Sequence, residues 1–294
     1  MTPDELAALV KNLKGIAPTR EARVGTNTPT SEAMLPRTQR KADILVLTAL
    51  REEAAPVAEL ADFDLKAQPE LVPGLHDCWF GEVGSSRIAL CTSDEMGLSA
   101  AASTSVRCAA HLQPSVVMLT GICGGYAKRN VRIGDVAVPK QVFHHQFGAL
   151  RNGEIEREAR LENLRRHQLY GLVKSCVGTA ATDFWNFQYG KVNLPDTRPE
   201  VVDGPMACAD LVVKDPDVLE KSSKFDRKVA SVDMESYATA FSIHQLSSAT
   251  QVFVVKAISD LADEKKEEAA VFRKYICQLA ASCTLHALKS IADS

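Results

Sequence analysis

From Ala42 onward, the chain alternates between short apolar runs and amphipathic runs. The apolar runs are typical of buried strands, and the amphipathic runs have the spacing of helices. Strands are predicted at residues 42–50, 77–83, 86–92, 114–121, 134–148, 206–213, 229–234 and 251–259, with a hairpin at Gly84 between the second and third. Helices are predicted at residues 51–62, 97–112, 216–225, 235–248 and 267–291. Strands that alternate with helices indicate an α/β fold whose central, mainly parallel sheet is covered on both faces.

Three stretches lack this regular pattern. Residues 151–174 are charged and favour a helix, whereas residues 178–204 carry Gly, Pro, Asn and Asp and predict a long loop. Near the start, a short helical pattern leads into a segment rich in Thr, Pro and Arg. We therefore expect an N-terminal helix and linker appendage at residues 1–41 and one core domain at residues 42–294.

Composition narrows the class of partner. The 294 residues are 46% hydrophobic and 24% charged, which allows one large core. The formal net charge of −3 provides no basic field of the kind that attracts nucleic acid or an anionic membrane. No apolar run approaches the roughly 20 residues that span a bilayer. We therefore expect a cytoplasmic protein with a small-molecule partner, and neither a nucleic-acid nor a membrane partner.

The cysteines and histidines do not form a metal-binding pattern. The eight cysteines include no CxxC pair, so they indicate reduced, mostly buried thiols rather than disulfides or ligands. His144 and His145 are adjacent, and neighbours on a strand point to opposite faces, which favours a structural role over a shared ion. We expect neither a metal nor a cofactor.

Carboxylates follow three of the predicted apolar strands. Glu52 and Glu53 follow the first strand, Glu235 follows the strand at 229–234, and Asp260 follows the last. Helix capping would explain any one of these acids, because helix N-termini favour negative charge. However, the carboxyl ends of strands in an open α/β sheet form its ligand crevice. Three acidic strand ends together therefore predict a site at one edge of the sheet.

A glycine cluster follows a fourth strand. Gly121, Gly124 and Gly125 would let the backbone turn sharply or approach a ligand closely. The chain contains neither the GxGxxG fingerprint in its dinucleotide-binding context nor a GxxxxGK[ST] phosphate loop. The sequence therefore argues against dinucleotide-binding and P-loop functions.

The segments ALREEAAPV, TGICGG followed by IGDVAV, SVDMES and VKAISDLAD occur in a distinctive order and spacing. They resemble the purine nucleoside phosphorylase and nucleosidase superfamily over roughly residues 43–291, and the 5′-methylthioadenosine/S-adenosylhomocysteine nucleosidase branch in particular. The resemblance implies a nucleoside phosphorylase-like three-layer α/β sandwich with a mixed sheet. It also implies a purine nucleosidase that hydrolyses the N-glycosidic bond of an adenosine-type nucleoside and releases the base. A homodimer or higher homo-oligomer is implied as well.

The resemblance assigns roles by position. Glu53 resembles the glutamate that activates water, Glu235 the ligand of the ribose hydroxyls, and Asp260 the acid at purine N7. The implied substrate-binding residues are Met234 under the ribose, Met96 near the sugar and its 5′ substituent, Val212 and Val213 at the base, and the adjoining Ile122, Cys123, Gly124 and Ser259. The residue types suit the chemistry, because protonation at N7 makes the purine a better leaving group while the sugar develops positive charge.

Three positions depart from the family pattern. Ile122 replaces a small hydroxyl residue near the attacking water, and Val212 stands where an aromatic residue usually stacks on the base. Lys256 replaces an arginine, which keeps the charge but loses the planar fork. These departures leave open a divergent member that acts on a purine nucleotide of the AMP or ATP type, or on another 5′-modified nucleoside.

Two other functions also remain open. A phosphate-dependent nucleoside phosphorylase would need cationic and hydroxyl ligands, whereas the first loop offers Glu52 and Glu53, with Arg51 as a candidate cation. A non-catalytic nucleoside-binding module is favoured by Ile122 and Val212. The three retained carboxylates argue against it.

Two side-chain groups have a structural and a functional interpretation. Arg151, Arg157, Arg160, Arg165 and Arg166 are interleaved with glutamates, which favours a solvated, salt-bridged helix face over phosphate recognition. Phe184, Trp185 and Phe187 have the size to cover a purine, but core packing is favoured.

Overall fold

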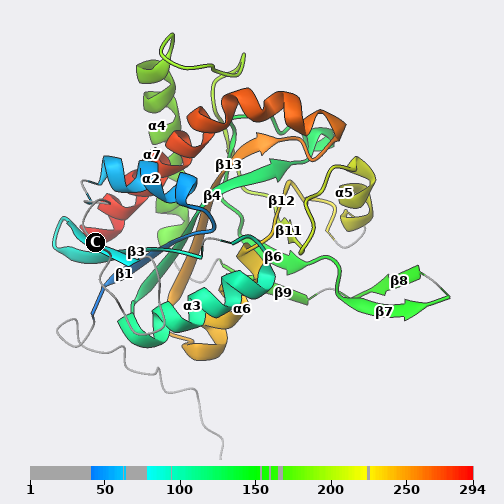
Figure 1. Ribbon diagram of the computed structural model, residues 1–294, viewed down its shortest axis with the longest axis horizontal. Coiled ribbons are helices and arrows are strands. Elements are labelled where there is room, and N and C mark those ends of the chain that lie inside the picture. Colours follow the sequence, from blue (N-terminus) through cyan, green and yellow to red (C-terminus); the bar gives the residue numbers. More distant parts are fainter. Residues whose placement is uncertain are drawn as a thin grey trace, which may run out of the picture. The chain divides into compact units, whose positions relative to one another are not determined.

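The computed structural model describes residues 41–61, 63, 78–93, 95–152, 154–158, 160–164, 168–223 and 226–293 (Figure 1). These residues belong to one compact unit. The predicted N-terminal helix and linker lie outside the described residues, apart from Lys41.

The described residues form an eleven-stranded mixed sheet. Its strands are β1 (Ile44–Thr48), β2 (Cys78–Val83), β3 (Ser86–Thr92), β4 (Val116–Gly125), β5 (Val136–Ala137), β6 (Gln141–His144), β9 (Arg160–Asn163), β10 (Val201–Val202), β11 (Met206–Cys208), β12 (Ser231–Asp233) and β13 (Gln251–Asp260). The central strand β4 lies between β1 and β13 and is parallel to both. At its far end β4 also pairs antiparallel with β12. The predicted hairpin is β2–β3.

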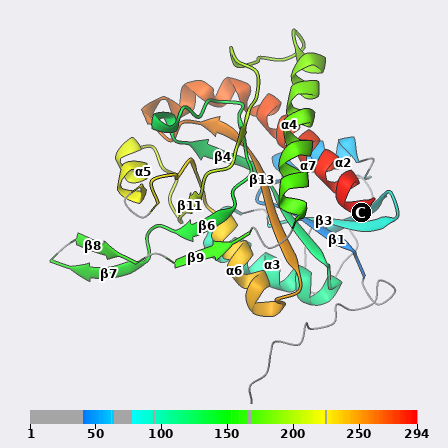
Figure 2. The same ribbon diagram turned by 180° about the vertical axis from the view of Figure 1, so that it is seen from behind.

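Helices cover both faces of this sheet (Figures 1 and 2). On one face, α2 (Arg51–Leu60), α4 (Leu169–Gln188) and α7 (Arg273–Ala292) share a hydrophobic core with the sheet. On the other face, α3 (Leu98–Leu112) and α6 (Ser236–Leu246) contribute to a second core. The remaining helical elements are η2 (Ala127–Arg129), α5 (Pro216–Ser222) and η3 (Glu264–Phe272). The three-layer α/β fold expected from the sequence is therefore confirmed.

The apolar runs become the central strands because both of their faces are buried. On β4, Met118 points into the first core, while Val117 and Leu119 point into the second. On β13, Phe253 and Val254 divide in the same way. Alternation between two apolar layers explains why these strands are continuously hydrophobic. Because β1, β4 and β13 are parallel, their carboxyl ends lie at the same edge of the sheet.

The long strand predicted at 134–148 is wrong. The structure has two short strands instead: β5 pairs with β10 and β13, and β6 pairs with β11 and β9. Pro139 lies between them, and a proline removes the N–H that a central strand would need for its ladder. The strand predicted at 206–213 is also shorter, because β11 ends at Cys208.

The helix predicted at residues 151–174 is wrong for residues 151–163 and right only for residues 169–174, which begin α4. The chain forms a separate hairpin of β7 (Gly148–Arg151) and β8 (Glu154–Arg157), which extends away from the main sheet (Figure 1), and then β9. Asn152 adopts a left-handed φ of 54°. The dipeptide Asn-Gly at 152–153 is a strong hairpin signal, so local turn chemistry outweighs the helical spacing of the charges.

Two further helix boundaries differ from the expectation. The loop predicted from residue 178 begins only after Gln188, because Ala181, Phe184 and Trp185 continue the buried face of α4 against α7. The final helix begins at Arg273 rather than near residue 267, since a 3₁₀ segment, η3, precedes it.

Candidate functional site

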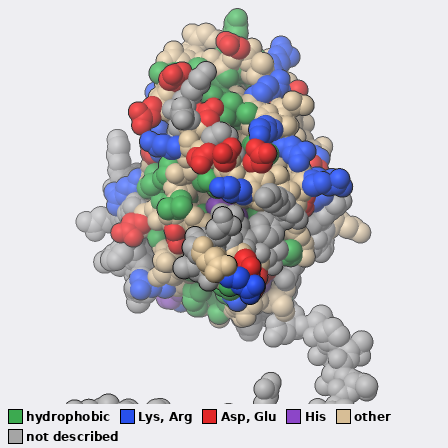
Figure 3. Space-filling model, turned by 90° about the vertical axis from the view of Figure 1, so that its right-hand side faces the viewer, with side chains coloured by type: hydrophobic (Ala, Val, Ile, Leu, Met, Phe, Trp, Pro, Cys, Tyr) green, Lys and Arg blue, Asp and Glu red, His purple; other side chains and the backbone are tan. Residues whose placement is uncertain are grey.

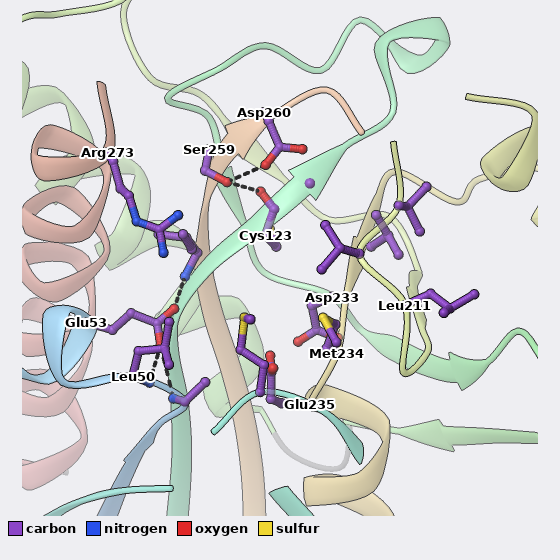
Figure 4. Close-up of a pocket in the computed structure, with 17 residues that line it drawn as sticks. Leu50, Glu53, Cys123, Leu211, Asp233, Met234, Glu235, Ser259, Asp260 and Arg273 are labelled. Carbon is purple, nitrogen blue, oxygen red and sulfur yellow. Dashed lines mark hydrogen bonds between the residues drawn. The ribbon is translucent and has the colours of Figure 1, made fainter. Parts of the chain in front are cut away.

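A pocket of about 230 Å³ lies at the carboxyl edge of the central strands (Figure 4). All eleven residues to which the resemblance assigns a catalytic or substrate-binding role line it: Glu53, Met96, Ile122, Cys123, Gly124, Val212, Val213, Met234, Glu235, Ser259 and Asp260. The sequence analysis did not single out six other lining residues: Ala49, Leu50, Leu211, Val232, Asp233 and Arg273. The structure therefore brings together side chains from segments that are more than two hundred positions apart in the sequence.

Glu53 is held by backbone donors. It lies in the first turn of α2 and is 4% exposed. Its Oε2 accepts hydrogen bonds from the N–H groups of Ala49 and Leu50, both at 3.0 Å, and its Oε1 accepts one from Ile122 N–H at 2.9 Å. Burial raises the pKa of Glu53, and the nearby Lys256 ammonium opposes that rise. The Glu53 carboxyl is thus fixed in position with a proton affinity above the ordinary value.

Gly121 makes room for this carboxyl. Its φ is 143°, which a residue with a side chain rarely adopts. A Cβ at this position would also overlap the Glu53 carboxylate. The glycine therefore serves the close approach of α2 to the end of β4.

Lys256 joins two carboxylates beneath the pocket. It comes from β13, is 1% exposed, and its Nζ lies 2.7 Å from Asp233 Oδ2 and 2.6 Å from Glu235 Oε2. Burial disfavours the ammonium, but the two adjacent carboxylates dominate and raise the pKa of Lys256 well above its ordinary value. Glu235 Oε1 also accepts a hydrogen bond of 3.3 Å from Gly97 N–H. The side chain of Glu235 is therefore held from two sides.

Asp233 is a buried anion with several donors. Burial alone would raise its pKa, but Lys256, Cys208 and Ser236 outweigh that effect and lower it. Cys208 Sγ donates to Oδ1 at 2.9 Å, and Ser236 Oγ donates to Oδ2 at 2.5 Å. Because Asp233 lies on β12 directly before Met234 and Glu235, this network fixes the segment that carries both.

Asp260 lies at the opposite end of the pocket from Glu235 (Figure 4). It is 3% exposed, and its Oδ1 accepts a hydrogen bond of 2.9 Å from Ala262 N–H. The Ser259 hydroxyl lies 2.7 Å from Asp260 Oδ2 and 3.2 Å from Cys123 O. The Asp260 carboxyl is thus oriented by its own loop.

Apolar side chains form the rest of the wall. Met96 and Val212 are 51% and 46% exposed and lie toward the opening, whereas Val213 is buried. Burial raises the pKa of the Cys123 thiol well above its ordinary value, so this cysteine is a neutral wall residue. The pocket combines an apolar slot with carboxyl groups at its ends and depth, an arrangement that suits a flat, polar-edged ligand.

Within the described part of the chain, the candidate aromatic residues and the candidate arginines of the 151–166 segment do not line this pocket. Phe184 and Trp185 are buried against Tyr275, and Phe187 is 64% exposed beneath Lys191. Arg151 pairs with Glu156, and Arg160 stacks over Phe147. Arg165 and Arg166 lie outside the described residues, as does the position of the Arg157 side chain.

The described residues contain no group of three or more His, Cys, Asp or Glu side chains arranged to hold a metal ion. Within the same residues, all eight cysteines are free thiols. Acidic and basic side chains are interspersed on the face shown in Figure 3. None of the helices in the described part of the chain is both long and apolar enough to cross a membrane.

A three-layer α/β fold with a carboxylate-lined pocket at the strand ends defines an α/β protein of the nucleoside phosphorylase type. The chain matches the model of the phosphorylase superfamily over residues 43–292, and it belongs to that family.

Proteins named as nucleosidases, and one named as a futalosine hydrolase, are among those to which the chain is similar. The 5′-methylthioadenosine/S-adenosylhomocysteine nucleosidase of Bacillus thuringiensis (strain Al Hakam) is 27% identical over 253 residues, 85% of this chain and 98% of the relative. The S-adenosylhomocysteine nucleosidase structure from Streptococcus pyogenes, in complex with 5-methylthiotubericidin, has a TM-score of 0.67 at 21% identity, covering 85% of this chain and 98% of that one. The futalosine hydrolase of Helicobacter pylori strain 26695 has a TM-score of 0.62 at 21% identity, with coverages of 84% and 97%. These structural likenesses establish the shared fold.

Proposed function

We propose that this chain is a purine nucleosidase that hydrolyses the N-glycosidic bond of an adenosine-type nucleoside, such as 5′-methylthioadenosine or S-adenosylhomocysteine, and releases the base. One observation carries the proposal: Glu53, Glu235 and Asp260, each from a different strand end, line the same pocket. The nucleosidase names of the similar proteins support the same reaction class.

Glu53 is the proposed general base. Three of the roughly four lone-pair sites on its carboxylate accept backbone hydrogen bonds, which leaves one for a water molecule. Its raised pKa makes it a better proton acceptor than an ordinary glutamate. Ile122 cannot bind water through its side chain, but its N–H orients Glu53 instead. The water loses its proton to Glu53 as its oxygen bonds to C1′.

Asp260 and Glu235 act on the two halves of the substrate. The Asp260 carboxyl delivers a proton to N7 of the purine while the bond from C1′ to N9 breaks, so that the base leaves as a neutral molecule. Glu235 accepts hydrogen bonds from the ribose hydroxyls and stabilises the positive charge that develops on the sugar. Lys256 is a positioning residue, because it holds Glu235 at 2.6 Å.

A phosphorylase is the rival with the same fold. Glu53 is the acid proposed to lie beside C1′, and its negative charge disfavours inorganic phosphate at that position. The test is incubation of the purified chain with adenosine, 5′-methylthioadenosine, S-adenosylhomocysteine and purine nucleotides, with and without phosphate, followed by chromatography. Free base and free sugar in phosphate-free buffer are expected. Product that appears only with phosphate, as ribose 1-phosphate, would move the chain to the phosphorylases.

The proposal includes a homo-oligomer, as the resemblance to the nucleosidases implies, and a location in the cytoplasm, as the sequence predicts. Light scattering during size-exclusion chromatography measures the assembly. A monomeric mass at the protein concentration of the assay would remove oligomerisation from the account.

A further inference from the structure

Arg273 is the one cation among the residues that line the described pocket. It is the first residue of α7, and the other charged lining residues are Glu53, Asp233, Glu235 and Asp260. These four acids are at most 5% exposed, whereas the Arg273 side chain is 41% exposed. Arg273 therefore lies where the pocket opens, and the acids lie in its depth. Figure 4 shows it on the same side as Glu53 and across from Leu211.

Glu52 orients the Arg273 guanidinium. Both Nε, at 2.9 Å, and Nη2 of Arg273 donate to a single oxygen of Glu52, Oε1. This hydrogen bonding, more than any other effect, raises the pKa of Arg273, so the side chain is a cation throughout the physiological range. A guanidinium has five N–H donors. Its Nη1 has no hydrogen-bond partner among the described residues, so one edge of the fork is available to a ligand.

The proposed function, on which this inference rests, determines what can reach that edge. The purine is bound at Asp260 and the ribose hydroxyls at Glu235, both deep in the pocket. The 5′ substituent is the remaining part of a nucleoside that can extend to the opening. The exposed side chains there are Arg273 and three apolar residues, Met96, Leu211 and Val212, which are 51%, 58% and 46% exposed.

The charge at the opening favours an acidic group over a neutral one. An apolar 5′ group would cover Nη1 of Arg273 without giving it an acceptor, and burying a polar group without a hydrogen-bond partner is costly. A phosphate or carboxylate would accept charge-assisted hydrogen bonds from the free edge, in the planar geometry that arginine offers. Lys256 cannot make this contact, because it is already shared between Asp233 and Glu235.

We propose that Arg273 determines specificity at the 5′ end of the substrate by binding an anionic 5′ substituent, so that a purine nucleotide with a 5′-phosphate is preferred over a neutral nucleoside. A carboxylate on the 5′ group is the other anionic group that would accept the same hydrogen bonds. The substrate class thus becomes a purine nucleoside that carries an acidic 5′ group.

The test compares four substrates with wild type, Arg273→Gln, Arg273→Lys and the control Arg151→Gln. Arg151 is an exposed arginine paired with Glu156 outside the pocket. The substrates are AMP, S-adenosylhomocysteine, adenosine and 5′-methylthioadenosine, the last two neutral at the 5′ end. Arg273→Gln is expected to lower kcat/KM for the preferred anionic substrate by about 10- to 100-fold, mainly through KM. For the neutral substrates we expect less than about a threefold change, and none for Arg151→Gln. Arg273→Lys should restore part of the loss.

The outcomes separate this inference from the proposed function. Equal effects of Arg273→Gln on anionic and neutral substrates would overturn the inference and leave the hydrolysis intact. A loss confined to AMP or to S-adenosylhomocysteine supports it and identifies the anion. If cleavage requires inorganic phosphate and Arg273→Gln abolishes it, Arg273 binds the phosphate co-substrate. That result would overturn the inference in favour of phosphorolysis. If no substrate is cleaved, calorimetric binding of AMP and adenosine to the same variants decides: a selective loss of AMP affinity supports the anion site, and unchanged affinities overturn it.

Discussion

Replacement of Lys256 by methionine removes the shared partner of two buried carboxylates. The Lys256 ammonium lies within 2.7 Å of both Asp233 and Glu235, and the three side chains are at most 6% exposed. Breaking a buried ion pair by removing one partner typically costs about 3–5 kcal/mol, because it leaves an uncompensated charge. We expect Lys256→Met to lower the free energy of unfolding by about this amount at neutral pH.

The pH dependence gives a sharper signature than the magnitude. In the wild type, the pKa of Asp233 is lowered, so its contribution to stability is present above the unfolded pKa and is lost as pH falls through the folded pKa. The pKa of Lys256 is raised, so its contribution is present below the unfolded pKa and is lost as pH rises through the folded pKa. Between these limits the pair contributes a constant stability. In Lys256→Met, burial raises the pKa of Asp233, and stability should instead increase as pH falls below neutral.

Urea unfolding measured at several values between about pH 5 and 8 tests both expectations. Lys174→Met is the matched control, since Lys174 pairs with Asp203 at the surface, where the two side chains are 39% and 50% exposed. Such pairs contribute about 0–1 kcal/mol. If Lys256→Met costs no more than Lys174→Met and follows the wild-type pH profile, the buried charge network does not exist as described.

Three other predictions concern the pocket, and a fourth concerns the N-terminal segment. Gly121→Ala should displace the Glu53 carboxylate and abolish most activity, whereas Gly171→Ala in α4, where a Cβ meets nothing within 4 Å, should leave activity unchanged in the same assay. The pH profile of kcat/KM should lose activity on the acidic side through the raised pKa of Glu53, above the ordinary glutamate value, and a limb at or below that value would contradict the assigned base. Asp260→Asn should lower kcat by about 10²–10⁴-fold with nearly unchanged substrate affinity, and near-normal turnover would remove the acid role. A chain without residues 1–41 should still melt cooperatively, and loss of that transition in calorimetry would show that the segment belongs to the core fold.

The core strands and the edge that carries the pocket could be predicted from the sequence, because the pattern that encodes them is local. The run before Leu50 and the run before Ser259 are apolar on both faces, and each leads directly into acids. The rule that ligands bind at the carboxyl ends of strands then brings Glu53 and Asp260 to one place. Their catalytic roles remain predictions until turnover is measured.

The remaining features depend on contacts between distant segments. Asp233 was overlooked because an acid inside a short strand has no local signature, and its partner Lys256 is on another strand. The sequence predicts Arg273 inside the final helix. In the structure it is the first residue of that helix, directly after a 3₁₀ segment, and Glu52 binds its guanidinium. The hairpin at Asn152 carried a local signal, which the helical spacing of the surrounding charges concealed.

The most direct test of the account follows an adenosine-type substrate by proton NMR in phosphate-free buffer, with wild type and Glu53→Gln compared at equal concentration and both checked for native folding. The account predicts that, with wild type, the H1′ signal of the nucleoside is replaced by the anomeric signals of the free sugar as the signals of the free base appear. The rate should be the same with or without added phosphate. Glu53→Gln should lose about 10²–10⁴-fold in that rate. An intact H1′ signal across neutral and anionic substrates, or equal rates for the two proteins, would contradict hydrolysis by this carboxylate pocket.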